Sequence, residues 1–256
     1  MSQLTLGCDP EVFLRKATGE FISSVKKIGG SKDYPMPIDD MGNAVQEDNV
    51  TVEFNTPPCQ SAADFIKHIN INKDWIKQRA SELGLEMAII PSAEFSDEEL
   101  DSRAAQTFGC EPDFNAWLDG RMNPRPRSKN ANLRSCGGHI HIALEETDDR
   151  LHVIQCMDLF VGCMMLEFDR DTQRRTLYGK AGAFRHKSYG VEYRTASNAW
   201  IESDERIQWA WDQTEKAVAY ARSGTGFTPE QAKMIQDCIN NSDLDLLDEL
   251  KMEFGL

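Results

Sequence analysis

Polar side chains recur two residues apart in four short segments of the chain. The pairs are Asp9 and Glu11, Glu53 and Asn55, His139 and His141, and Glu192 and Arg194. Side chains alternate across a β-strand, so both members of a pair lie on one face when the segment is a strand. The apolar residues between or beside them then belong to the opposite face. The pattern predicts an antiparallel sheet with a polar concave face and helices packed on its other side, an α+β fold.

The other elements are predicted from periodicity and from turn and capping residues. Strand candidates span residues 4–13, 20–25, 50–55, 86–90, 139–144 and 189–194, and each is bounded by Gly, Pro, Asn or Asp. Helices are expected over 61–83, 150–168, 203–222 and 242–254, and Thr228-Pro229-Glu230-Gln231 is a typical helix start. Because no repeat or linker interrupts the chain, we expect one domain over 1–256, with 228–256 as a helical C-terminal extension.

The charge balance excludes a general nucleic-acid binder. The chain has 28 Lys and Arg residues against 42 Asp and Glu residues, a formal net charge of −14, which repels a polyanion. Residues 121–135 and 170–194 are exceptions, because each segment has a net positive charge. Planar arginine side chains suit phosphate or carboxylate, so these segments predict a local anion site. Two solvated loops are the alternative.

Neither the N-terminus nor the cysteines indicate export. The first residues lack a basic stretch followed by a long apolar one, so we expect no signal peptide. The longest apolar run, near residues 161–166, is too short to span a membrane. Seven cysteines without a CxxC pair suit reduced thiols better than a disulfide framework. We therefore expect a soluble, cytoplasmic protein with no membrane partner.

The four polar pairs together predict a metal site. Carboxylates brought close together raise one another's pKa unless a cation lies among them. An oxygen-rich set with one or two imidazoles suits Mg²⁺ or Mn²⁺ better than Zn²⁺. Gly137 and Gly138, just before the two histidines, permit close approach of the backbone to a ligand. Each pair also has an ordinary interpretation: histidines bonded to neighbours, a solvated edge strand, a turn at Asn55, or a surface ion pair of Glu192 and Arg194.

Five blocks of sequence resemble a known family. They are GCDPEVF at 7–13, DNVTVEFN at 48–55, FGCEPD at 108–113, GGHIHI at 137–142 and GVEYR at 190–194. In this order they are similar to the phage-type carboxylate-amine ligases, or amidoligases, which are related to glutamate-cysteine ligase and, more remotely, to glutamine synthetase. The resemblance covers about residues 5–202 and implies a glutamine-synthetase-like half-barrel, a curved antiparallel sheet backed by helices.

The resemblance also implies roles for individual residues. The expected metal ligands are Asp9, Glu11, Glu53, His139 and Glu192. The expected ligands of nucleotide phosphates or of the substrate carboxylate are His141, Lys180, Arg185 and Arg194. Among these, Glu53, Arg185 and Arg194 are expected to act in catalysis. The basic segment 121–134 and the glycine-containing loop 178–185 are expected to cover the site.

The implied activity is an ATP-dependent ligase that forms an amide or peptide bond through an acyl phosphate, with Mg²⁺ or Mn²⁺. Its substrates would be a small carboxylate, for which an amino acid is one candidate, and an amine or ammonia. A metal-dependent hydrolase and a non-catalytic binding protein are the alternatives. The family's phage association implies the host cytoplasm, and the oligomeric state stays open. Glu53→Ala and Glu192→Ala are expected to fold while weakening metal-dependent nucleotide binding, and Cys110 is expected to be dispensable for catalysis.

Overall fold

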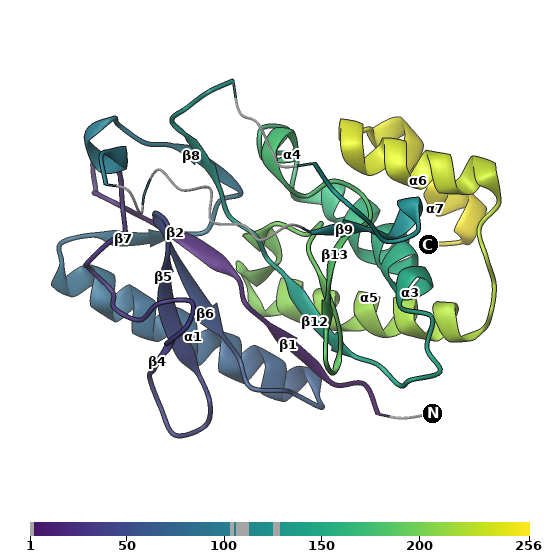
Figure 1. The fold of residues 1–256 in the computed structure, drawn as a ribbon, viewed down its shortest axis with the longest axis horizontal. Coiled ribbons are helices and arrows are strands. Elements are labelled where there is room, and N and C mark those ends of the chain that lie inside the picture. Colours follow the sequence, from purple (N-terminus) through teal and green to yellow (C-terminus); the bar gives the residue numbers. More distant parts are fainter. Residues whose placement is uncertain (1–2, 103–104, 106–112, 125–128) are drawn as a thin grey trace.

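The computed structural model describes residues 3–102, 105, 113–124 and 129–256 (Figure 1). The strands are β1 (Leu6–Cys8), β2 (Glu11–Arg15), β3 (Phe21–Ile22), β4 (Met36–Pro37), β5 (Ala44–Asp48), β6 (Thr51–Asn55), β7 (Glu86–Ala88), β8 (Ser92–Glu94), β9 (Phe114–Asn115), β10 (Arg121–Met122), β11 (Leu133–Ser135), β12 (Ile140–Ala143), β13 (Ala183–Lys187) and β14 (Gly190–Tyr193). The α-helices are α1 (Ala62–Glu82), α3 (Arg150–Met157), α4 (Arg174–Leu177), α5 (Asp204–Arg222), α6 (Pro229–Asn241) and α7 (Leu244–Phe254). Short helical turns are η1 (Glu98–Leu100), η2 (Ala116–Leu118), η3 (Asp158–Cys163), η4 (Met164–Glu167) and η5 (Asn198–Ile201).

Two antiparallel sheets share the N-terminal segment of the chain. Sheet I has the strand order β1-β12-β14-β13-β9-β10. Sheet II has the order β3-β2-β6-β5-β4, with β7 also paired to β2. The chain leaves sheet I after β1 and enters sheet II at β2, with only Asp9 and Pro10 between them. The first predicted strand, over 4–13, is therefore two strands with a break at Pro10, which has no backbone N–H to donate to a ladder.

Helices cover one side of the two sheets. Figure 1 shows α1 behind β5 and β6, and α3 and α5 behind β12 and β13, with α6 and α7 farther out. The side chains of Val52, Phe54, Ile140, Ile142 and Val191 are fully buried in the main apolar core on this side. The predicted curved antiparallel sheet backed by helices is confirmed, and so is the apolar face opposite the polar pairs.

The predicted helix starts are confirmed at atomic detail. Ser61 accepts a hydrogen bond from the backbone N–H of Asp64 at the start of α1, and Ser203 caps α5 in the same way. Thr228 and Gln231 form a complete capping box at the start of α6. These side chains satisfy backbone donors that a helix leaves unpaired in its first turn.

The continuous α-helix predicted over 150–168 is wrong beyond residue 157. The α3 helix ends at Met157, and the wider π-turn η3 and the tighter 3₁₀ turn η4 follow. Gly162 lies in η3, and a Cβ atom there would come within 2.6 Å of the Tyr193 hydroxyl. The change of helix type thus accommodates a close approach of β14, which carries Glu192.

The C-terminal helices pack against the main core. Ile235 and Ile239 of α6 and Leu247 and Leu250 of α7 are buried in it. Every cysteine in the described ranges, including Cys156 and Cys163, is a free, buried thiol, as the sequence predicted for the thiols in general. Among the described residues, no helix is both long and apolar enough to cross a membrane.

Candidate active site

A polar cavity of about 220 Å³ lies where the chain passes from sheet I to sheet II. Most of the predicted site residues line it: Asp9, Glu11, Glu53, His139, His141, Arg185 and Arg194. Glu192 is fully buried and contacts several of them. Lys180 does not line the cavity; its side chain is exposed and its carbonyl accepts a hydrogen bond from Thr195. The sequence thus located the cavity, while the role predicted for Lys180 stays a prediction.

One group of possible ligands comes from sheet I. Asp9, His141 and Glu192 each offer one ligand atom, and these atoms lie within 4.8 Å of one another. His141 and Glu192 are directly opposite on β12 and β14. Asp9 Oδ2 lies 3.2 Å from His141 Nε2, and Asp9 Oδ1 lies 3.1 Å from His139 Nδ1. We call Asp9, His141 and Glu192 the neutralised cluster, because protein cations contact both of its carboxylates.

Glu192 has cationic partners on both carboxylate oxygens. Arg194 Nη1 donates to Oε1, and Arg185 Nη1 lies 3.6 Å from the same oxygen. Lys187 Nζ lies 2.7 Å from Oε2. Arg194 is only 5% exposed, so its pair with Glu192 is buried and is not the surface ion pair considered as an alternative. Burial and Asp9 raise the pKa of Glu192, but Arg194 and the two histidines outweigh them and lower it to about 2.

The histidines have different protonation tendencies. Burial raises the pKa of Asp9, but the charges of His141 and His139 outweigh burial and hold it well below its ordinary value. Burial and Arg194 lower the pKa of His139 to about 4. For His141, burial lowers the pKa, but Asp9 outweighs burial and raises it. Tyr189 Oη lies 2.8 Å from His141 Nδ1 and so fixes the orientation of the ring toward Asp9.

A second group of possible ligands comes from sheet II. Glu11, Asp48 and Glu53 offer carboxylate oxygens that all lie within 4.8 Å of one another. Glu11 and Glu53 are directly opposite on β2 and β6, a pairing of like charges that destabilises a sheet. Gln46 donates to Glu53 at 2.8 Å, and the N–H of Gly137 donates to Glu11 at 2.6 Å. We call Glu11, Asp48 and Glu53 the acidic cluster.

The acidic cluster has too little positive charge around it to neutralise its three carboxylates. Burial and Asp48 raise the pKa of Glu11 to about 8, despite the hydrogen bond from Gly137. Burial, Asp9 and Glu11 raise the pKa of Glu53 well above its ordinary value. Burial also raises the pKa of Asp48, despite opposing effects of Lys32 and Arg194. Such a donor set fits Mg²⁺ or Mn²⁺, because a divalent cation among three carboxylates removes the repulsion that raises these pKa values.

A buried carboxylate anchors the strand that carries Glu192 and Arg194. Asp158 in η3 is fully buried and accepts hydrogen bonds from Trp117 Nε1 at 2.6 Å and from the Gly182 N–H at 2.5 Å. Its other oxygen accepts from Tyr193 at 2.8 Å and from Thr195 at 3.2 Å. Tyr193 and Thr195 flank Arg194 in the chain. Asp158 therefore fixes β14 relative to the loop 178–183.

The glycines noted in the sequence make room for protein groups. A Cβ on Gly137 would come within 2.2 Å of His139 Nε2, so the His139 ring lies against this glycine. Gly179 has φ +78° and a Cβ there would come within 1.8 Å of Arg174 Nη1. Gly182 is also at φ +78°, and a Cβ there would come within 2.6 Å of Asn115 Oδ1. Packing thus accounts for these glycines, including those of the loop expected to pass beside a nucleotide.

Four polar cavity residues were missed in the sequence. Gln46 and Asp48 are two residues apart on β5, and Arg185 and the missed Lys187 are two apart on β13. The spacing that revealed the other pairs applies here too, but neither segment was recognised as a strand. The fourth, Lys32, lies in the loop before β4. Asp48 did belong to one of the family-like blocks, which was a usable signal.

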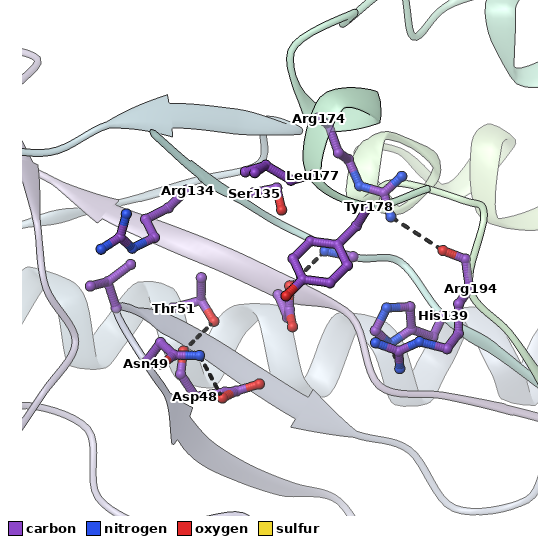
Figure 2. Close-up of a pocket in the computed structure, with 13 residues that line it drawn as sticks. Asp48, Asn49, Thr51, Arg134, Ser135, His139, Arg174, Leu177, Tyr178 and Arg194 are labelled. Carbon is purple, nitrogen blue, oxygen red and sulfur yellow. Dashed lines mark hydrogen bonds between the residues drawn. The ribbon is translucent and has the colours of Figure 1, made fainter. Parts of the chain in front are cut away.

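A smaller pocket of about 50 Å³ adjoins the cavity, and the two share Glu11, Asp48, His139 and Arg194. Figure 2 shows Asp48 and Asn49 on one side of this pocket and His139 and Arg194 on the other. Its wall includes Arg174, which donates to the carbonyls of Cys136, Thr195 and Ala196. Arg134, also in the wall, donates to the carbonyls of Ala131, Leu133 and Ala105. These two arginines of the basic segments therefore hold backbone in place.

Some predicted features lie outside the described residues. They are Phe108 to Pro112 of the FGCEPD block, with Cys110, and Arg125 and Arg127 of the basic segment. Asp113, the last residue of the block, is described, and its Oδ2 lies 3.9 Å from Arg194 Nε.

The geometry can be compared with known proteins. Residues 124–237 match the model of the phage phiEco32-like COOH.NH2 ligase-type 2 family. This part of the chain is similar to the carboxylate-amine ligases. The match confirms the predicted resemblance over this part of the chain. The matched residues include His139, His141, Glu192 and Arg194, whereas the acidic cluster lies before them. Among curated proteins, no sequence matches the chain.

Two solved structures show a weaker likeness. A bifunctional glutathione synthetase from Pasteurella multocida has 12% identity and a TM-score of 0.47, over 99% of this chain and 47% of that chain. GmaS in complex with ADP has 13% identity and a TM-score of 0.39, over 97% of this chain and 66% of that chain. This chain thus spans about half the length of the glutathione synthetase. At TM-scores below 0.5, neither likeness establishes a common fold.

Proposed function

We propose that the protein is an ATP-dependent ligase that joins a small carboxylate to an amine through an acyl phosphate. The observation that carries this proposal is the meeting of a buried acidic cluster and several basic side chains in one cavity. The cations that line it are Lys32, Arg185, Lys187 and Arg194. Carboxylates for a divalent ion beside cations for phosphates are what phosphoryl transfer requires. The family match supports the ligase class.

In this proposal the acidic cluster holds Mg²⁺ or Mn²⁺. Glu11, Asp48 and Glu53 supply three carboxylates at one place, and their raised pKa values indicate that a cation is needed there. The bound ion offsets the charge of the phosphate oxygens. The neutralised cluster, with His139 beside it, is the candidate position of a second ion. Its own carboxylates are already paired, so we expect that position to bind metal more weakly.

The basic side chains would bind the phosphates and the substrate carboxylate. Arg194 lies between the clusters, and it acts on the pKa values of Glu11, Asp48 and Glu192. Arg185 is directly opposite Glu192 across β13 and β14. Asn55 lines the cavity, and its buried Nδ2 has no hydrogen-bond partner among the described residues, so it can donate to a ligand oxygen. Tyr189 and Asp9 orient His141, which would bind a phosphate while the neutralised cluster is empty and the second ion once that ion is bound.

The proposed reaction has two steps. A carboxylate is a poor acylating agent, because its leaving group would be oxide. Transfer of the γ-phosphoryl group of ATP to a carboxylate oxygen gives ADP and an acyl phosphate, and attack by the amine then forms the amide and releases phosphate. The cavity and the adjoining pocket both reach Glu11 and Asp48, an arrangement that suits two reactants approaching one centre from two sides.

The test is ADP and phosphate release with ATP and Mg²⁺ or Mn²⁺, screened across amino acids and other small carboxylates with and without ammonia. Hydroxylamine is included because it traps an acyl phosphate as a hydroxamate. We expect substrate-dependent ADP release with hydroxamate formation, and its loss in Glu53→Gln. Glu167→Gln, a surface substitution in the ion pair with Lys251, is the matched control.

Two results would contradict the proposal. Metal-dependent hydrolysis of a substrate without any requirement for ATP would indicate a hydrolase. Absence of metal-dependent binding of ADP or ATP would indicate a binding protein that retains the fold. ADP binding is measured by calorimetry, so this second arm does not depend on finding the substrate.

A further inference from the structure

Lys187 occupies an unusual position at the edge of the cavity. Its Nζ lies 2.7 Å from Oε2 of Glu192, a residue that is itself fully buried. The other oxygen of Glu192 receives a hydrogen bond from Arg194. Both oxygens of this predicted metal ligand therefore already have a protein cation beside them. Arg185 lies farther away, with its Nη1 3.6 Å from Oε1, so a metal ion at the neutralised cluster has to replace one of the two closer contacts, from Lys187 or from Arg194.

The two cations differ in how easily they can leave. The Arg194 side chain is 5% exposed, and it lies in a strand segment that Asp158 anchors through Tyr193 and Thr195. The Lys187 side chain is 31% exposed and comes from the last residue of β13. Its ammonium is a point charge on a flexible four-carbon stem, whereas an arginine fork holds a fixed geometry. Of the two contacts, that of Lys187 with Glu192 is therefore the one that a metal ion displaces more easily.

The strand register explains how the Lys187 side chain reaches Glu192. Glu192 is opposite His141 on β12 and opposite Arg185 on β13. Lys187 is opposite Gly190, which has no side chain, two residues from Glu192. A long side chain reaches such a diagonal neighbour across a sheet. The same stem can turn instead into the cavity that Lys187 lines.

We propose that Lys187 is a displaceable counter-ion, which neutralises Glu192 in the metal-free protein and moves to a nucleotide phosphate when a divalent ion binds Asp9, His141 and Glu192. A divalent ion and an ammonium repel each other at one carboxylate, so the two states exclude each other. The released ammonium remains within the cavity, where a phosphate offers a new partner. This inference rests on the proposed metal and nucleotide site. It implies that Lys187 weakens the binding of the divalent ion and strengthens the binding of the nucleotide.

The test compares Lys187→Met with Lys251→Met. Lys251 is a matched control, because its side chain is 28% exposed and is paired with Glu167 far from the cavity. Mn²⁺ binding is measured by calorimetry in the Glu53→Gln background, which removes a ligand of the acidic cluster. ADP binding is measured at saturating Mn²⁺ in the otherwise unchanged protein. Lys187→Arg, which keeps the charge, is the conservative variant.

We expect Lys187→Met to raise Mn²⁺ affinity about fivefold and to lower ADP affinity by a similar factor, since a partly exposed ion pair contributes at this scale. Lys251→Met should change neither, and Lys187→Arg should retain most of the ADP affinity. Unchanged affinities, or a fall in both, would overturn the displacement of Lys187 while leaving the proposed site intact. Absence of Mn²⁺ and ADP binding in the unchanged protein would overturn the proposed function as well.

Discussion

The neutralised cluster has two carboxylates and an imidazole and the acidic cluster has three carboxylates, and the two clusters also differ in the charge around them. Sheet I brings Arg185, Lys187 and Arg194 to Glu192. Burial raises the pKa of this carboxyl, but Arg194 and the two histidines outweigh burial and lower it to about 2. Sheet II brings Glu11 and Glu53 face to face, and burial and Asp48 raise the pKa of Glu11 to about 8. One cluster therefore carries its cations within the protein. The other needs a cation from solution.

Because of this difference, removing a carboxylate should have opposite consequences for stability in the two clusters. In the neutralised cluster, loss of a carboxylate leaves buried cations without a partner, which is costly. In the acidic cluster, loss of a carboxylate relieves repulsion. The equal behaviour expected from the sequence for Glu53 and Glu192 variants is thereby revised. Four measurements test this contrast, and they are described from the largest expected effect to the smallest.

Glu192→Gln should destabilise the protein most. Arg194 is 5% exposed and would lose its ionised partner, and breaking a buried pair typically costs about 3–5 kcal/mol. Urea unfolding measures the free energy directly. Glu167→Gln, which breaks a more exposed ion pair with Lys251, is the control and should cost about 1 kcal/mol or less. Equal losses in the two variants would remove the contrast between the clusters.

Glu53→Gln should leave stability unchanged or higher in metal-free buffer. The substitution removes a buried charge and keeps an oxygen for the hydrogen bond from Gln46. Mn²⁺ affinity should nevertheless fall about a hundredfold or more, because even partners outside the ligand set contribute about 10- to 100-fold. Calorimetry measures the affinity and urea unfolding the stability. A stability loss as large as that of Glu192→Gln would mean that the acidic cluster is held together by contacts other than a bound cation.

Asp158 offers a third buried carboxylate, one held by hydrogen bonds. Burial raises its pKa to about 7, despite the four donors that surround it. Because the folded state holds this proton at a pH where the unfolded state has lost it, the contribution to stability should fall as pH rises from about 4 to about 7. Unfolding free energies from pH 5 to 7 should therefore fall in the unchanged protein relative to Asp158→Asn, by at most about 1.4 kcal/mol per pH unit. Parallel pH curves would show that Asp158 is ionised in the folded state throughout this range.

Tyr189→Phe should have the smallest effect. It removes the hydroxyl 2.8 Å from His141 Nδ1 at a half-exposed position, where one hydrogen bond contributes about 1 kcal/mol. We expect ADP affinity at saturating Mn²⁺ to fall about three- to fivefold with unchanged urea stability, as about 1 kcal/mol allows. Tyr34→Phe, at an exposed tyrosine, is the control. A stability loss without any change in ADP binding would make Tyr189 a purely structural residue.

The sequence predicted the sheet and most of the site chiefly because of one rule, the two-residue spacing of polar side chains. The rule succeeded for Glu53 and Asn55, whose intervening Phe54 marks a strand clearly. It missed Asp48 because AVQED has too few apolar residues to be recognised as a strand, and Lys187 because AFRHK has the same defect. Strand identity there comes from pairing with neighbours, which the local sequence does not contain.

The charge contrast could not be predicted at all from the sequence. Glu53 and Glu192 are both carboxylates on strands with apolar neighbours, and nothing local distinguishes them. Glu53 meets Glu11 and Glu192 meets Arg185 only through the register of their strands. The break of the helix after Met157 is a similar case, because Asp158 of η3 is bonded to Tyr193 and Thr195, about 35 residues away, and the local sequence does not contain these contacts.

The short connection from β1 to β2 limits the backbone distance between Asp9 and Glu11 in the site. Asp9 belongs to one cluster and Glu11 to the other, and only Pro10, with its fixed φ, separates them. Two residues span at most about 7 Å, so the Cα atoms of Asp9 and Glu11 stay within this distance however the two sheets pack. One member of each cluster is therefore tied to the other cluster by the covalent chain itself, and a shift of one sheet relative to the other cannot carry these two residues apart.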